Sequence, residues 1–104
     1  MPSVTVRPLA WREINKHLDY LEKQAGLQTA ERFLDRLIDS FEAPAHMPRM
    51  GVVCGFRKPA TRYLRRWPVK ESEDWLIFYQ ARRTIVEIVH VMHGARDIES
   101  LLND

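Results

Sequence analysis

Hydrophobic residues recur along the chain with the spacing of strands and helices. Ser3–Arg7 alternates valines with polar residues, which predicts a short strand. Apolar residues recur at steps of three and four over residues 9–25 and again over 30–41, which predicts two helices. Gly26 can adopt the left-handed conformation that ends a helix, and the short link predicts an antiparallel helical hairpin. We expect Pro44 to end the second helix.

The C-terminal half contains the other regular elements. Three runs are typical of strands: Arg62–Trp67, Trp75–Tyr79 and Thr84–His93. We expect Pro68 to end the first run or to place it at a sheet edge, because proline cannot donate to a strand ladder. Residues 80–83 are expected to form a tight connection, and residues 44–61, rich in proline and glycine, a loop. A short helix is expected over Arg96–Leu102.

These elements predict an α+β fold in the order β-α-α-β-β-β. An antiparallel sheet would pack on the helical hairpin, with a short helix at the C-terminus. A chain of 104 residues is expected to form one domain, spanning residues 1–104.

Two of the predicted strands are apolar on both faces. Trp75–Tyr79 carries large apolar side chains at every position, and Thr84–His93 carries them on both sides. A helical hairpin covers only one face of a sheet, so the terminal helix, a second copy or another protein must cover the other. We expect a partner protein there, because a terminal helix of about two turns is small beside the apolar strip.

The charges of the chain are segregated. Residues 44–70 carry seven cations and no acidic residue, whereas the segments before and after them are net negative. The cations are Arg49, Arg57, Lys58, Arg62, Arg65, Arg66 and Lys70. Such a segment favours either a surface for an anionic partner, nucleic acid or an acidic protein segment, or a solvated basic loop.

Several classes of protein are excluded or disfavoured by composition. Cys54 is the single cysteine, so intramolecular disulfides and cysteine-rich zinc sites are excluded. The spacing of His, Asp and Glu does not resemble a metal site, and the absence of a glycine-rich phosphate loop predicts no nucleotide cofactor. Apolar runs are far shorter than the ~20 residues of a spanning helix, and the N-terminal residues do not resemble a signal peptide. We therefore expect a cytoplasmic protein that does not act in a membrane.

Four segments resemble the ParE/RelE toxin superfamily in sequence, order and spacing. They are Pro48–Gly51, Arg65–Val69, Trp75–Tyr79 and Ile85–Asp97. The resemblance covers essentially the whole chain. It implies the toxin of a type II toxin–antitoxin pair, which needs no cofactor and forms a hetero-oligomer with a cognate antitoxin. In that superfamily the ParE branch poisons DNA gyrase, and the RelE branch cleaves messenger RNA on the ribosome.

The resemblance implies a surface that contacts the antitoxin or the target. We expect its residues to be cationic or aromatic: Arg62, Arg65, Arg66, Trp67, Trp75, Tyr79 and Arg96. A fold-on-binding antitoxin segment would cover apolar area and meet these cations together.

Ribonuclease activity is the alternative function. Cleavage through the 2′-hydroxyl needs a base, cations around the phosphate and an acid for the leaving oxygen. The candidates are Arg65 and Arg66 for the phosphate, and Glu87, His90 or His93 for proton transfer. Strand alternation places Glu87 and His93 on one face of their strand and His90 on the other. Arg62 and Arg96 are further phosphate candidates, and Tyr79 could stack a base or donate a proton.

Two features favour a binding protein over a nuclease. RelE-like nucleases tend to end with a catalytic tyrosine or a His-Tyr pair, whereas no Phe, Tyr or Trp follows Tyr79 here. His93 also has a structural interpretation, as a strand-end histidine bonded to a carboxylate such as Asp97. The resemblance, together with these two features, therefore implies a ParE-like toxin that inhibits a replication target such as DNA gyrase. A family member that has lost toxicity and only binds its antitoxin is a third possibility.

Overall fold

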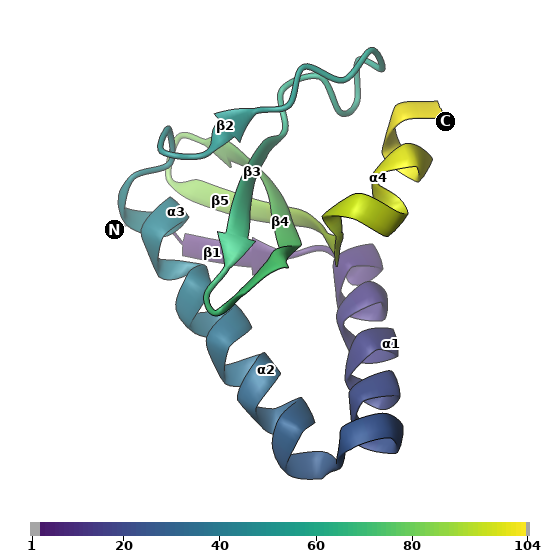
Figure 1. Cartoon of the computed structure of the whole chain (residues 1–104). Coiled ribbons are helices and arrows are strands. Elements are labelled where there is room, and N and C mark those ends of the chain that lie inside the picture. The colour runs from purple at the N-terminus through teal and green to yellow at the C-terminus, as the bar shows by residue number, and fades with distance from the viewer. Residues whose placement is uncertain (1–2, 104) are drawn as a thin grey trace.

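The computed structural model describes residues 3–103, and side chains for residues 3–98. Helices and strands follow one another as β1 (Ser3–Val6), α1 (Pro8–Ala25), α2 (Leu27–Ser40), α3 (Glu42–His46), β2 (Val52–Val53), β3 (Arg65–Val69), β4 (Ser72–Arg82), β5 (Ile85–His93) and α4 (Gly94–Asn103). Figure 1 shows α1 and α2 as the two arms of a hairpin, with α4 projecting from the end of β5. The predicted α+β architecture is confirmed.

The five strands form one sheet in the order β1-β5-β4-β3-β2. Strands β2 to β5 pair antiparallel, as predicted for the C-terminal half. β1, however, pairs in parallel with β5, with Ser3 opposite Ile85, so the sheet is mixed and not wholly antiparallel. The alternation of valines in β1 predicts a strand but carries no information about the direction of its neighbour.

The helical hairpin is confirmed, and one proline behaves differently from the prediction. Pro8 occupies the first position of α1, where its missing N–H leaves no hydrogen bond unmade. Gly26 alone links α1 to α2 and has a φ of 92°. Pro44 does not end α2, which stops at Ser40, but lies in the first turn of the short helix α3. Proline is tolerated there because the first N–H groups of a helix have no intrahelical acceptor.

Strand boundaries in the C-terminal half differ from the predicted ones. β3 begins at Arg65, not Arg62, and includes Pro68. β2 pairs with Arg65 and Arg66 of β3 but does not reach Pro68. At Pro68, β3 is therefore the edge strand of the sheet, as predicted. β4 continues to Arg82, so the predicted connection over residues 80–83 is mostly strand. The turn itself contains Arg83, which has a φ of 27°.

A bulge in β5 reverses which side chains face the helical hairpin. Phe78 pairs with His90 and Tyr79 with Ile88, so Val89 is an extra residue in the ladder. Val86 and Ile88, before the bulge, and Val91, after it, all lie in the core between the sheet and the hairpin. Even-numbered residues of β5 therefore face the hairpin before the bulge, and odd-numbered residues face it afterwards. The prediction that Glu87 and His93 share one face is therefore wrong.

The second face of the sheet is covered by the chain itself. A separate core cluster contains Phe78, Val89 and Met92 from this face, together with Phe56 and Leu64 from the segment between β2 and β3. Ile98 of α4 packs against the same cluster. The expectation that a partner protein must cover this face is wrong, because the segment classed as a basic loop carries the missing apolar side chains.

Across the described residues, every helix is too short or too polar to span a bilayer. Within the same residues, no three His, Cys, Asp or Glu side chains gather as a metal site would need.

Replacing Phe56 with alanine should destabilise the fold strongly. Its ring is 5% exposed and lies 6.1 Å from that of Phe78, so truncation would leave a cavity over the second face. We expect a loss of about 3–5 kcal/mol in the free energy of unfolding, measured by urea denaturation. Tyr63→Ala in the same segment is the control, since Tyr63 is 71% exposed and should change stability by less than about 0.5 kcal/mol. Equal effects of the two substitutions would contradict the assignment of Phe56 to the core.

Candidate functional site

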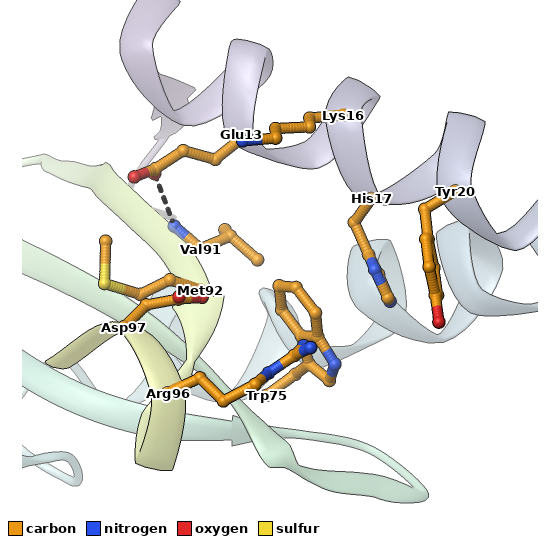
Figure 2. A pocket seen from close by; sticks show the side chains of 9 residues that line it. All are labelled: Glu13, Lys16, His17, Tyr20, Trp75, Val91, Met92, Arg96 and Asp97. Carbon is orange, nitrogen blue, oxygen red and sulfur yellow. Dashed lines mark hydrogen bonds between the residues drawn. The ribbon is translucent and has the colours of Figure 1, made fainter.

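A cleft of about 410 Å³ opens between α1, the paired ends of β4 and β5, and the start of α4. Figure 2 shows its side chains, which come from α1, β4, β5 and α4. The residues lining it are Glu13, Lys16, His17, Tyr20, Trp75, Val91, Met92, Arg96 and Asp97. Two residues of the predicted contact surface, Trp75 and Arg96, therefore lie together here.

Trp75 lies between a histidine and an arginine. The His17 ring stacks on it at a centroid distance of 3.8 Å, and the Arg96 guanidinium carbon lies 6.0 Å from its centroid. His17 also meets Phe33 edge-on at 4.7 Å. Burial, followed by the charges of Arg96 and His93, lowers the pKa of His17 to about 4. His17 is thus a neutral aromatic member of the cleft near pH 7.

His17 is a site residue that reasoning from the sequence did not single out. It lies three residues after Ile14 and four before Leu21, so helical spacing places it on the buried stripe of α1. This spacing is the signal in the sequence that could have identified it.

His93 forms the cap of α4. Its Nδ1 accepts a hydrogen bond of 3.1 Å from the backbone N–H of Arg96, and its own N–H donates to Asp97 Oδ2 at 3.1 Å. This reciprocal arrangement satisfies two backbone donors at the start of the helix. The predicted bond between His93 and Asp97 therefore exists, but through the backbone of His93 and not its ring. Because Nδ1 is an acceptor, the ring proton of neutral His93 lies on Nε2.

Glu13 of α1 closes the open edge of β5. β1 ends at Val6, so the later residues of β5 have no strand neighbour on that side. Glu13 Oε1 accepts from the Val91 N–H at 3.0 Å, and Oε2 lies 2.9 Å from His90 Nδ1. Glu13 could not be identified from the residue pattern, because its carboxylate has a structural role only where β5 lacks a strand neighbour.

Glu87 is held as an anion. Its Oε1 accepts from Arg7 Nη2 at 2.8 Å and from Gln80 Nε2 at 2.6 Å. These two hydrogen bonds, with the Arg7 charge, lower the pKa of Glu87. Glu87 therefore stabilises the junction of β1, β4 and β5 and is a weak base.

Tyr79 is fully buried and ties the segment before β2 to the sheet. Its hydroxyl donates to Pro48 O at 2.8 Å and accepts from Gly51 N–H at 2.9 Å. A Cβ on Gly51 would lie 2.5 Å from that hydroxyl oxygen, which explains the glycine. Burial raises the pKa of Tyr79. The expectations that Tyr79 contacts a partner or stacks a base are wrong, because its ring and hydroxyl are enclosed.

Arg65 acts on the same segment. Its Nη1 donates to Gly51 O at 2.7 Å and to Arg49 O at 3.1 Å. Arg65 therefore holds backbone carbonyls, whereas its neighbour Arg66 points to solvent.

The remaining residues of the predicted contact surface do not form one cluster with the cleft. Arg62 and Arg66 are exposed on the segment before β3 and on β3 itself. Trp67 packs partly against the core between sheet and hairpin. The structure thus offers two places for a partner, the cleft around Trp75 and the basic surface near β3.

Comparison with known proteins shows the family. Residues 4–98 match the model of the ParE toxin of the type II toxin–antitoxin system parDE. The chain belongs to the ParE toxin family. No curated protein sequence matches this ParE-family toxin. A solved structure titled as the chromosomal ParDE TA system from P. aeruginosa has a similar fold, with a TM-score of 0.72 over 89% of this chain and 96% of that chain, at 11% identity.

Membership of the family indicates what kind of protein the toxin pairs with. The family is described as the toxin of a toxin–antitoxin pair, so the second component of the system is an antitoxin. The resemblance found in the sequence is confirmed.

Removing the Tyr79 hydroxyl should destabilise the toxin. In Tyr79→Phe the Gly51 N–H and the Pro48 carbonyl lose their buried partner. We expect a loss of about 1–3 kcal/mol in the free energy of unfolding, measured by urea denaturation. Tyr63→Phe, on a ring that is 71% exposed, is the matched control and should be neutral. Equal stability of wild type and Tyr79→Phe would show that the hydroxyl bonds contribute nothing.

His17 should make the toxin less stable in mild acid. The folded protein binds a proton at His17 only near pH 4, whereas the unfolded chain does so near pH 6.5. Between these values the unfolded state holds more protons, so stability falls as pH decreases from about 6.5 toward 4. His17→Phe keeps an aromatic ring against Trp75 and cannot titrate. Urea midpoints measured across this range should fall more steeply for wild type than for His17→Phe, and parallel profiles would contradict the low pKa.

Proposed function

We propose that this toxin inhibits DNA replication by binding a protein target, DNA gyrase, and that a cognate antitoxin silences it by occupying its contact surface. The observation that carries a binding mechanism is that three of the four candidate catalytic groups are held by contacts within the fold, whereas Arg66 is exposed. Arg65 holds two carbonyls, Glu87 is paired with Arg7, and the His93 ring accepts a helix N–H.

The candidate proton-transfer groups also lie apart. Glu87 and His93 are six positions apart along β5, which corresponds to at most about 20 Å at 3.3 Å per residue. The bulge at Val89 turns them toward opposite faces of the sheet. A phosphodiester held between a base and an acid needs both within hydrogen-bond reach. This separation supports a toxin that acts by binding.

The exposed cations suit a large anionic or acidic partner. Six of the seven cations of residues 44–70 are exposed, and Arg65 is half-buried. Their positive potential would speed the encounter with an acidic protein surface. The choice of gyrase as the target is supported by the sequence resemblance to the ParE branch of the ParE/RelE superfamily, because that branch poisons DNA gyrase.

Brief induction of the toxin alone in a bacterial host tests the proposal. Pulse labelling of DNA and protein should show early loss of DNA synthesis with translation intact, and co-expression of the antitoxin should restore growth. Early loss of translation with cut transcripts would instead establish an mRNA nuclease. Unimpaired growth with soluble toxin present would leave only antitoxin binding.

A charge variant links the effect to the basic surface. Arg66→Glu should weaken growth inhibition, because Arg66 is exposed on β3 and forms no ion pair among the described side chains. Arg32→Glu on α2 changes the net charge equally at an exposed site outside the basic segment and is the control. Equal inhibition by both variants would remove Arg66 from the contact surface.

A further inference from the structure

The cleft around Trp75 presents a surface of three aromatic rings. The rings of Trp75 and His17 stack with an interplanar angle of 28°, and those of His17 and Tyr20 lie 6.1 Å apart at 15°. Phe33 packs edge-on against both His17 and Trp75, so these two rings are held in place by the fold. Tyr20 is 57% exposed, and Trp75 is half-buried. The cleft therefore offers flat aromatic area that is arranged before any ligand arrives.

The acidic side chains of the cleft are bonded within the fold. Both oxygens of Glu13 contact β5, and Asp97 Oδ2 accepts a hydrogen bond from the His93 N–H. Figure 2 shows the Glu13 carboxylate directed toward Val91 and away from the rings on the other side of the cleft. The two carboxylates of the cleft therefore stabilise the ends of β5 and α4.

The two cations of the cleft differ from its acids. Among the described side chains, neither Lys16 nor Arg96 forms an ion pair, and both residues are exposed. Lys16 lies four residues before Tyr20 on α1, where helical spacing makes them neighbours, and Arg96 lies 6.0 Å from the Trp75 ring centroid. After burial, the charge of Arg96 is the next cause of the low pKa of His17. The electrostatic potential at the rings is therefore positive.

We propose that the cleft binds a small planar aromatic acid. The ring of this acid packs against Tyr20 and Trp75. Its carboxylate pairs with Lys16 and Arg96. The cleft volume of about 410 Å³ is within the range of about 300–1,000 Å³ that is typical of small-molecule sites.

The acids of the cleft favour a carboxylate over a phosphate as the anionic group of the ligand. A phosphate carries a charge of about −1.5 to −2 near pH 7, whereas a carboxylate carries a single charge. The negative charges of Glu13 and Asp97 would therefore repel a phosphate more strongly. The inference does not rest on the proposed function, because the ligand binds the toxin alone.

The indole N–H signal of Trp75 in the nuclear magnetic resonance spectrum tests this directly. The isotopically labelled toxin is titrated with 2-naphthoate and, in parallel, with 2-naphthamide, an uncharged analogue of the same shape. The Trp75 signal, assigned by its loss in Trp75→Phe, should shift and saturate with 2-naphthoate. Binding of 2-naphthamide should be at least about fivefold weaker. Trp11 is 41% exposed and does not line the cleft, so its signal should stay in place.

Substitutions locate the site. Arg96→Gln and Lys16→Gln should each weaken binding of 2-naphthoate by about threefold or more, whereas Arg32→Gln on α2 should not. Tyr20→Ala should also weaken binding by about threefold, because the ligand loses a stacking partner. Tyr63→Ala is its matched control, since Tyr63 is 71% exposed and lies outside the cleft.

Four results would overturn the proposal. They are absence of a saturable shift at Trp75, an equal shift at Trp11, equal binding of acid and amide, and unchanged binding in both Arg96→Gln and Lys16→Gln. Tighter binding of adenosine monophosphate at Trp75 would also overturn it, because the site would then select a phosphate. None of these readings depends on growth inhibition, so the failure of this inference and the failure of the proposed function are distinguishable.

Discussion

The position of one extra residue in β5 determines much of the geometry around the cleft. Without the bulge at Val89, side chains would keep their alternation along the strand, and His93 would face away from the hairpin. With it, Val91 lies in the core between sheet and hairpin, and the His93 ring lies 5.8 Å from that of Trp75. The same register places His93 at the start of α4, which it caps.

The part of β5 that follows the bulge is stabilised by an interaction from outside the sheet. Val91 has no strand neighbour on the β1 side, and an unpaired N–H there would be costly if buried. Glu13 supplies the acceptor from α1, and its second oxygen meets His90. The helix and the irregular strand therefore stabilise each other, and the wall of the cleft that contains Val91 is built from both.

Much of the fold could be predicted from the sequence, but of the site only Trp75 and Arg96 could. The helical stripes, Gly26 and the two-faced strands in the C-terminal half all indicate the architecture that is found, because spacing and turn chemistry are local properties. The roles of Glu87, His93 and Tyr79 depend on partners far away in the sequence, such as Arg7 and Pro48. The bulge likewise leaves no mark in the residue pattern, since Ile88, Val89 and Val91 are equally suited to either face.

The contact between Gly51 and the Tyr79 hydroxyl also bears on how the family can diverge. A side chain at position 51 would collide with the tyrosine, and a smaller residue at position 79 would leave the Gly51 N–H unbonded and open a void beside it. A change at either position alone would therefore lower the stability of the fold, whereas a joint change could fill the same space. These two positions, 28 residues apart in sequence, should therefore be inherited as a pair, even between relatives as distant as those that share little beyond the fold.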